Sequence, residues 1–416
     1  MLTSRISSTS DGQDFVAGQM NVQPMLISFS TDGRNVYLHQ IQNLKVVSQG
    51  DPIQSAFHRN NLNPVLKGFK IAAKDSSSVF IDVTNFFGTN EKSISPIKDS
   101  DPVSKLLGGG NNLKGTFVAD ASGISEVKSF EKNIEIETLL SYMTTGAVVK
   151  PYSVYVRRSL FVLPDSPMSM RLQDNRVGYF YTDKDIFTTT EDKIQQQSYI
   201  NRWRLEPKEE DVERYFRGEL VEPKKPIIFY VDTAFPEKWR KTIREGIEIW
   251  NRAFEQAGFK NAVQAYDYPE DDPQFDPDDM RYNCFRYVVT ATQNAMGPSY
   301  TDPRTGEILA ADVIWYHNIV SLLHNWRFIQ TAAVDKRVRK SVFDDDVMCE
   351  SMKYAASHEI GHTLGLMHNM GASYSFPVDS LRNPVFTQKY GTTPSIMDYA
   401  RNNYVAQPGD LEKASN

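Results

Sequence analysis

The sequence has few cysteines, no long apolar run and no excess of basic charge. Cys284 and Cys349 are too few for a disulfide framework and form no C-x-x-C pair. One bridge between them is an alternative to two unpaired thiols, the usual state of buried cysteines. Apolar runs such as Ile227–Val231 fall far short of the ~20 residues that span a bilayer. With 46 basic and 52 acidic residues, the chain has no electrostatic support for nucleic-acid binding.

The first residues also lack a basic stretch followed by an apolar one, so the chain shows no secretory signal. A cytoplasmic protein would look like this, and so would a secreted protein whose first residues are missing. The 416 residues, 24 % of them charged and 40 % hydrophobic, are typical of a globular protein of two or three domains.

Up to about Tyr181, short alternating runs of apolar and polar residues predict antiparallel strands. Asn35–Ile41 and Tyr152–Leu163 are examples, and turn signals such as Thr31–Arg34 separate the runs. We therefore expect a β-rich N-terminal domain over residues 1–205, built as a sandwich or a strongly curved sheet.

Residues 206–226 are charged and proline-bracketed, which predicts a linker. Beyond it, Ile227–Val231 predicts a strand, and a helix is expected between Pro236 and Gly258. The apolar stripe of that helix is Trp239, Ile243, Ile247, Trp250 and Phe254. Further strands are predicted at Arg281–Thr290 and Ile308–Tyr316. The pattern predicts an α/β domain over residues 227–416, and hence an α+β chain.

Two polar stretches carry no clear function. Asn90–Asn112 is glycine-rich and is predicted to be a loop, because no Lys-Ser/Thr follows it as in a phosphate loop. Tyr266–Asp279 holds seven carboxylates in fourteen residues. Ca²⁺ prefers several oxygen ligands, but the spacing is not that of an EF-hand loop. A solvated acidic loop is therefore favoured over a Ca²⁺ site.

The residues with clear chemistry are His358, His362 and His368. At positions i and i+4 of one helix, the first two share a face and can bind one ion. Gly365 can take a positive φ and end the helix, so that His368 returns to the same ion. Three neutral imidazoles suit Zn²⁺ and leave one position for water, as in catalytic rather than structural zinc sites.

Glu359 lies beside the first of these histidines and is not needed as a ligand. Zinc lowers the pKa of its bound water toward ~7. A carboxylate within reach can take the proton as the water attacks a carbonyl, and can pass it to the leaving amine. The pattern predicts peptide hydrolysis.

The spacing H-E-x-x-H-x-x-G-x-x-H resembles the metzincin clan of zinc metallopeptidases. The resemblance implies that Met397, in Ser395–Tyr399, forms a Met-turn, an apolar floor under the metal. It also implies that Tyr399 has the role of the tyrosine in the astacin and serralysin branches, which reaches the zinc and stabilises the oxyanion. A packed or exposed tyrosine without that role is the alternative.

Upstream segments resemble large bacterial, mostly Bacteroidota-type, zinc-dependent metallopeptidases with an N-terminal domain of unknown function. They include Trp250–Phe254, Asp302–Leu309 and the junction Asn201–Pro207. The resemblance implies export to the periplasm, the cell surface or the medium. It also implies that Ile308–Tyr316 is the cleft-rim strand that pairs with extended substrate.

The chain departs from that family in two respects. Asn369, after the third histidine, is not the residue of the best-known branches, so the subfamily stays open. Only 19 residues follow Met397, whereas metzincins continue with at least a helix. We therefore expect the chain to be cut at its C-terminus, and its abrupt start suggests the same at the N-terminus.

The leading hypothesis is a secreted zinc metallopeptidase, and more narrowly an endopeptidase. It predicts one catalytic zinc and protein or peptide substrates. One alternative is a cell-surface protein- or glycan-binding module with a vestigial peptidase domain, although an intact Glu359 argues against a relic. Another is a zinc hydrolase of a non-peptide amide. The sequence leaves the cleavage specificity, the role of the N-terminal domain and the oligomeric state open.

Overall fold

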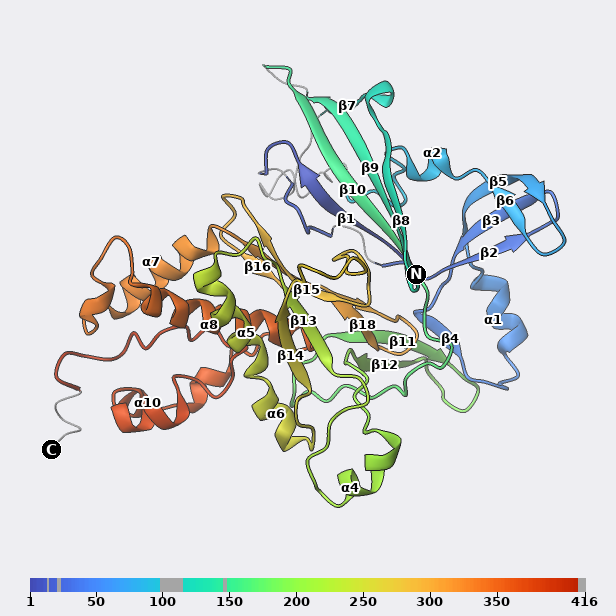
Figure 1. Cartoon of the computed structure of the whole chain (residues 1–416). Coiled ribbons are helices and arrows are strands. Elements are labelled where there is room, and N and C mark those ends of the chain that lie inside the picture. Colours follow the sequence, from blue (N-terminus) through green and yellow to red (C-terminus); the bar gives the residue numbers. More distant parts are fainter. Residues whose placement is uncertain (13–14, 21–23, 98–114, 145–147, 411–416) are drawn as a thin grey trace.

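A computed structural model describes residues 1–12, 15–20, 24–97, 115–144 and 148–410 (Figure 1). They form a β-rich N-terminal region followed by an α/β region, which confirms the predicted α+β class. Most of the predicted loop Asn90–Asn112, from residue 98 onward, lies outside the described residues. In the described ranges, no helix has the length and apolar character needed to cross a bilayer.

The described N-terminal residues form three sheets. The first is antiparallel, with the order β1 (Leu2–Thr9), β10 (Pro151–Phe161), β9 (Asn133–Thr144), β7 (Gly115–Phe117), and β8 (Gly123–Ser129) also pairs with β9. The second is β2 (Ile27–Thr31), β3 (Asn35–Gln40), β5 (Val65–Lys74), β6 (Val79–Ile81). The third is β12 (Gln195–Ile200), β11 (Tyr181–Phe187), β4 (Lys45–Val47). Short helices are α1 (Gln54–Asn60), α2 (Thr84–Phe87) and η1 (Ala119–Ala121).

The alternation of apolar residues correctly located the strands with one solvated face, such as β3. It missed β1, where the polar residues Thr3, Ser4 and Arg5 are buried together with Leu2 and Ile6. A strand covered on both faces loses the period of two on which the prediction depends.

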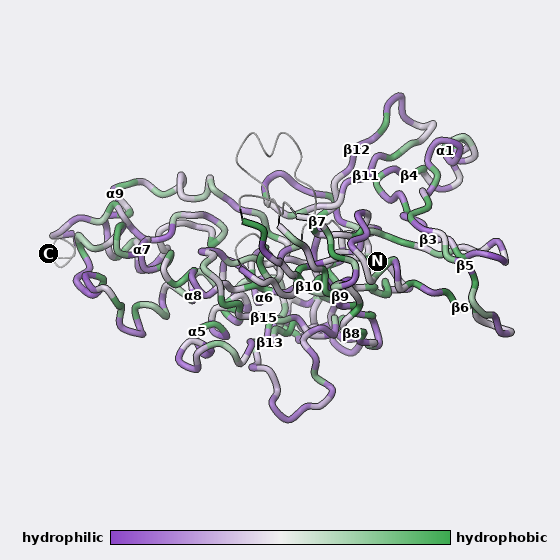
Figure 2. Tube along the Cα trace, turned by 90° about the horizontal axis from the view of Figure 1, so that it is seen from above, coloured by the Kyte–Doolittle hydropathy of each residue, from purple (hydrophilic) through white to green (hydrophobic). Residues whose placement is uncertain are grey.

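The α/β region is built on a five-stranded sheet in the order β14 (Val263–Asp267), β13 (Ile227–Val231), β15 (Asn283–Val288), β19 (Val313–Tyr316), β16 (Ala295–Met296). All neighbours are parallel except β16, which pairs antiparallel with β19. A separate hairpin joins β17 (Ser299–Thr301) to β18 (Ile308–Ala311). Figure 2 shows apolar residues gathered in the middle of the molecule, around β10, β13 and β15.

Helices α5 (Glu237–Glu248) and α8 (Asp345–Thr363) pack against this sheet, and α7 (Ile319–Thr331) packs against α8. The other helices of the region are α6 (Asn251–Gln256), η3 (Lys336–Val338), η4 (Ala372–Ser375), α9 (Val378–Leu381) and α10 (Pro384–Tyr390). The single helix predicted between Pro236 and Gly258 is thus two, α5 and α6. The residues predicted for its apolar face, Trp239, Ile243 and Ile247, are buried in the core as expected.

Residues 206–226, predicted as a linker, fold into η2 (Glu209–Asp211) and α4 (Val212–Phe216). Val221 is buried against Phe259 of the α/β region. The division of the chain at this segment stays a prediction. Both cysteines are free thiols, Cys284 buried and Cys349 partly buried.

A carboxylate whose side chain is only 12 % exposed joins the two regions. Asp278 lies 2.6 Å from the Arg5 guanidinium of β1, 2.7 Å from that of Arg157 in β10 and 3.1 Å from the Lys128 ammonium of β8. Arg286 of β15 lies 3.9 Å away on the other side. The acidic segment Tyr266–Asp279 therefore ends in an ion-pair network, and its interpretation as a solvated loop is wrong at this end.

We expect Asp278→Asn to lower the free energy of unfolding by about 3–5 kcal/mol, because it leaves buried cations without their partner. Burial acts to raise the pKa of Asp278, but Arg5, Arg286 and Arg157 outweigh it and hold that pKa well below its usual range. This stabilisation is complete above the unfolded-state pKa of ~3.9 and is lost as the pH falls below it.

Urea unfolding of wild type and Asp278→Asn between pH 3 and 7 checks this prediction. Asp271→Asn, an exposed change in the same acidic segment, is the matched control and should leave the midpoint unchanged. Equal stability of the two variants at pH 7 would contradict the role of Asp278.

Candidate metal centre

Helix α8 holds two of the predicted ligands in fixed positions, with His358 buried and His362 partly buried. It begins after Asp344, with Asp345 and Asp346 in its first turn, where carboxylates suit the helix dipole. Gly246 of α5 allows close packing, since an added Cβ would lie 3.0 Å from Ala356. The Trp250 indole donates a hydrogen bond of 2.9 Å to the carbonyl of Ser357, the residue before the first ligand.

The helix ends in a Schellman motif around Gly365. The Gly365 N–H donates to the His362 carbonyl and the Leu366 N–H to the Gly361 carbonyl, each over 3.0 Å. Gly365 has φ +97°, and an added Cβ would collide with the Asn201 carbonyl oxygen. The chain therefore reverses sharply and brings His368 back to the helix.

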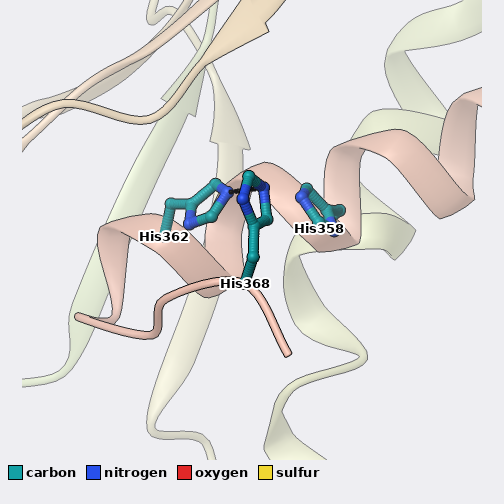
Figure 3. A group of neighbouring side chains, drawn as sticks. All are labelled: His358, His362 and His368. Atoms are coloured by element: carbon teal, nitrogen blue, oxygen red, sulfur yellow. Dashed lines mark hydrogen bonds between the residues drawn. The ribbon is translucent and has the colours of Figure 1, made fainter. Parts of the chain in front are cut away.

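His358, His362 and His368 meet as the sequence predicted (Figure 3). One ring nitrogen from each lies within 4.8 Å of the others. The Nε2 atoms of His362 and His368 are 3.1 Å apart. Such a group can hold one ion.

Hydrogen bonds at the opposite ring nitrogens favour metal binding. Nδ1 of His358 lies 2.8 Å from the Ile396 carbonyl, and Nδ1 of His362 lies 2.8 Å from the Leu366 carbonyl. A carbonyl only accepts, so each Nδ1 carries the proton and each Nε2 has a free lone pair. The buried Nε2 of His358 has no hydrogen-bond partner. An unpaired buried acceptor aimed at two further imidazoles is the arrangement that a zinc ion would satisfy.

The imidazoles are held neutral. Burial lowers the pKa of His358 to about 4, outweighing the hydrogen bond to Ile396, which raises it, and the other two histidines lower it further. Burial also lowers the pKa of His362 and of His368. Neutral imidazole is the form that binds a metal, so the group needs no deprotonation at pH 7.

Comparison with protein families finds two matches. Residues 18–208 match a family described as "Domain of unknown function (DUF5117)", and residues 340–416 match the family described as "Met-zincin". The chain contains a Met-zincin domain. A Met-zincin domain with a histidine triad indicates a zinc metallopeptidase. Searches among curated proteins and among solved structures gave no significant match.

In the Met-zincin domain, Glu359 follows the first histidine and its side chain is partly buried. Removal from water raises the pKa of its carboxyl group to about 7. A group with that pKa exchanges a proton readily near neutral pH. The Glu359 charge interacts with Tyr399, and the catalytic role of Glu359 stays a prediction.

Met397 lies under the triad. Its side chain is buried, and its sulfur occupies the space that a Cβ on Gly361 would fill. The preceding residue, Ile396, supplies the carbonyl that orients His358. The Met397 carbonyl accepts a hydrogen bond of 2.8 Å from the Asn369 N–H, next to the third histidine. The role of Met397 as a floor under the metal stays a prediction.

Tyr399 lies at the open side of the triad. Its ring centroid is 4.7 Å from that of His368 and 5.5 Å from that of His358, and the residue is 46 % exposed. The Arg401 guanidinium lies between the rings of Tyr399 and Trp326, 3.7 Å from the centroid of the latter. The tyrosine is thus close enough to reach a group bound at the triad.

The strand predicted for the cleft rim is in the wrong place. Ile308–Tyr316 divides at Asp312 into β18 and β19, and β19 lies inside the sheet. Asp312 is buried and accepts hydrogen bonds from the Cys284 N–H and the Arg286 guanidinium, which interrupts the run. The edge strands of this sheet are β14 and β16. Gly297 follows β16, and a Cβ added to it would lie 2.6 Å from the Glu359 carbonyl oxygen.

Sequence reasoning missed the residues that reach the triad from the N-terminal region. The Trp203 indole donates a hydrogen bond of 2.8 Å to the Thr363 carbonyl at the end of α8. The Phe180 ring lies 5.9 Å from the His362 ring. The only signal was the junction Asn201–Pro207, whose tryptophan and arginines are unusual for a linker.

Two other histidines of the α/β region do not belong to the triad. The His324 ring stacks on Phe343 at 4.0 Å, and His317 bonds to the Tyr287 hydroxyl. In the described ranges, the triad is the one group of three or more metal-binding side chains that converge. The Ca²⁺ site considered for Tyr266–Asp279 therefore has no support.

We expect Gly365→Ala to destabilise the protein and weaken metal binding. The positive φ alone costs about 1–2 kcal/mol with a Cβ present, and the collision with the Asn201 backbone adds to it. Urea unfolding and zinc titration measure both effects. Gly371→Ala is the control, since its φ is −84° and its Cβ meets nothing within 4 Å. Similar behaviour of the two variants would refute the argument.

Proposed function

We propose that the chain is a zinc-dependent endopeptidase in which Glu359 is the general base. The observation that carries the proposal is the convergence of one ring nitrogen from each of three histidines, with the Nδ1–H groups of His358 and His362 bound to carbonyls. Glu359 directly follows the first of these histidines in the sequence. Three imidazoles and an adjacent carboxylate are the side chains that metal-assisted hydrolysis of an amide requires.

His358, His362 and His368 would hold the zinc, which when bound polarises a carbonyl and lowers the pKa of a coordinated water toward ~7. Glu359 accepts the proton of the attacking water and transfers it to the leaving amine. Its position one residue after His358 keeps the carboxylate next to the ligands without making it one. Met397 supports the ligands from below and excludes water there.

Tyr399 would stabilise the negative charge that develops on the substrate carbonyl oxygen. Its hydroxyl is a hydrogen-bond donor on a half-exposed ring close to His358 and His368.

The substrate would be an extended peptide. Strand β16 lies at the edge of the sheet, next to α8 through Gly297. An edge strand leaves backbone donors and acceptors for an added strand, which favours a polypeptide substrate over a small amide. We also propose that the protein is exported from the cytoplasm and that the chain divides into two domains near residues 206–226.

Glu359→Gln should lower the rate of peptide hydrolysis by about 10²–10⁴-fold or more and should leave one zinc bound per chain. Cleavage of a peptide library and metal analysis by mass spectrometry test both parts. Glu255→Gln, an exposed change on α6, is the control and should hydrolyse as wild type. If zinc-loaded wild type cleaves no peptide, the peptidase proposal fails and a binding module with a vestigial peptidase becomes the better hypothesis.

Tyr399→Phe should lower kcat by about 10²-fold with little change in KM, because the lost hydroxyl acts on charge present only in the transition state. Steady-state kinetics on a library-derived peptide measure this. Tyr404→Phe, 68 % exposed in the same segment, should behave as wild type. An unchanged kcat in Tyr399→Phe would refute the oxyanion role of this tyrosine.

A further inference from the structure

A short strand from the N-terminal region runs along the loop that joins the second and third histidines. The Phe180 N–H donates to the Gly365 carbonyl over 2.7 Å, and the Met367 N–H donates to the Gly178 carbonyl over 2.9 Å. Tyr179 and Leu366 form the antiparallel bridge between them. Each bond joins a residue of the range 18–208, which matches DUF5117, to a residue of the range 340–416, which matches Met-zincin.

The bridge fixes the residue that orients His362. Leu366 provides the carbonyl to which Nδ1 of His362 is bonded, at 2.8 Å. The two backbone bonds of the bridge lie on its neighbours, Gly365 and Met367, one on each side. The direction of the Leu366 carbonyl therefore depends on the N-terminal strand, and so does the orientation of the His362 ring.

A second N-terminal segment holds the end of α8. Trp203 donates its indole N–H to the Thr363 carbonyl over 2.8 Å. Thr363 is completely buried, and the last carbonyls of a helix have no partner within the helix. Asn201 joins the two segments, because its N–H donates to the Phe180 carbonyl over 2.7 Å.

The two segments are attached to the α/β region on their other side as well. The Arg202 N–H donates to the Gly306 carbonyl and the Ile308 N–H donates to the Arg202 carbonyl, each over 2.9 Å. The N-terminal residues thus lie between the start of β18 and the metal-binding loop. They connect the loop to the body of the molecule rather than resting on its surface.

We propose that residues 178–180 and 201–203, the supporting strands, are positioning residues of the metal centre and that zinc binds tightly only when they are in place. This rests on the zinc site of the proposed function, but not on peptide hydrolysis. The N-terminal region is then a part of the metal-binding unit and not a separable domain that covers or recruits substrate.

Two variants remove single hydrogen bonds. Trp203→Phe keeps an aromatic ring and loses the donor to Thr363, and Phe180→Pro loses the N–H that bonds to Gly365. Groups that orient metal ligands typically contribute 10–100-fold to metal affinity. We expect the zinc dissociation constant to rise about 10-fold in Trp203→Phe and about 10- to 100-fold in Phe180→Pro.

Two further variants are controls. Trp239→Phe removes an indole N–H that has no hydrogen-bond partner, so it tests the loss of a buried tryptophan alone. Phe180→Leu keeps the backbone N–H and changes only the ring, so any further loss in Phe180→Pro is due to the N–H. Trp239→Phe should bind zinc with the affinity of wild type, and Phe180→Leu should bind it more tightly than Phe180→Pro.

Competition with a chromophoric chelator gives the zinc affinity of the full chain, and the visible spectrum of the Co²⁺-substituted protein reports ligand geometry. Melting with and without zinc separates positioning from general stability: the rise in Tm on adding zinc should shrink in Trp203→Phe and not in Trp239→Phe. Wild-type affinity and an unchanged Co²⁺ spectrum in Trp203→Phe would overturn the proposal, as would equal losses in Trp203→Phe and Trp239→Phe.

The same measurements separate this proposal from the proposed function. If wild type binds zinc but cleaves no peptide, the proposed peptidase function is refuted. Weaker zinc binding in Trp203→Phe would still support the positioning role of the supporting strands. A wild type that binds no zinc overturns the positioning role. If Phe180→Pro does not fold, Trp203→Phe alone decides.

Discussion

The reversal of the chain at Gly365 is the constraint on which the metal centre depends. A residue with φ +97° packed against the Asn201 carbonyl has no room for a side chain. The reversal places the Leu366 carbonyl within hydrogen-bonding distance of Nδ1 of His362 and returns His368 toward the helix. A few backbone atoms, rather than a large apolar contact, thus set the positions of two of the three imidazoles. This explains why the loop is held by hydrogen bonds on both of its sides.

The two regions of the chain meet through charge. A buried ion pair is seldom a net source of stability relative to apolar packing, because both partners lose their hydration. Its value lies in geometry, because Asp278 forms ion pairs with cations from three strands of one sheet and so constrains how the two regions meet. The supporting strands need such a defined arrangement, since a shift of one residue would break the hydrogen bonds that hold Gly365 and Met367.

The metal centre could be predicted from the sequence because its signal is local. His358, Glu359, Gly365 and His368 lie within eleven residues, and helix geometry with one glycine turn brings the ligands together. The rim strand could not, because an edge position depends on strand order, which a run of apolar residues does not encode. Trp203 and β1 were missed for a related reason: their partners lie far along the chain, and burial on both faces removes the alternation that marks a strand.

The position of β1 has a consequence for how the chain folds. Arg5 and its partner Asp278 are 273 residues apart, so the strand that begins the sequence is completed by an acidic turn made much later. At the usual speed of synthesis, roughly 15–55 s pass between the two. Until then an early pairing of β1 with β10 leaves the guanidinium of Arg5 in water. Contacts of such long sequence separation also make folding slow, since a large loop must close before any of them forms.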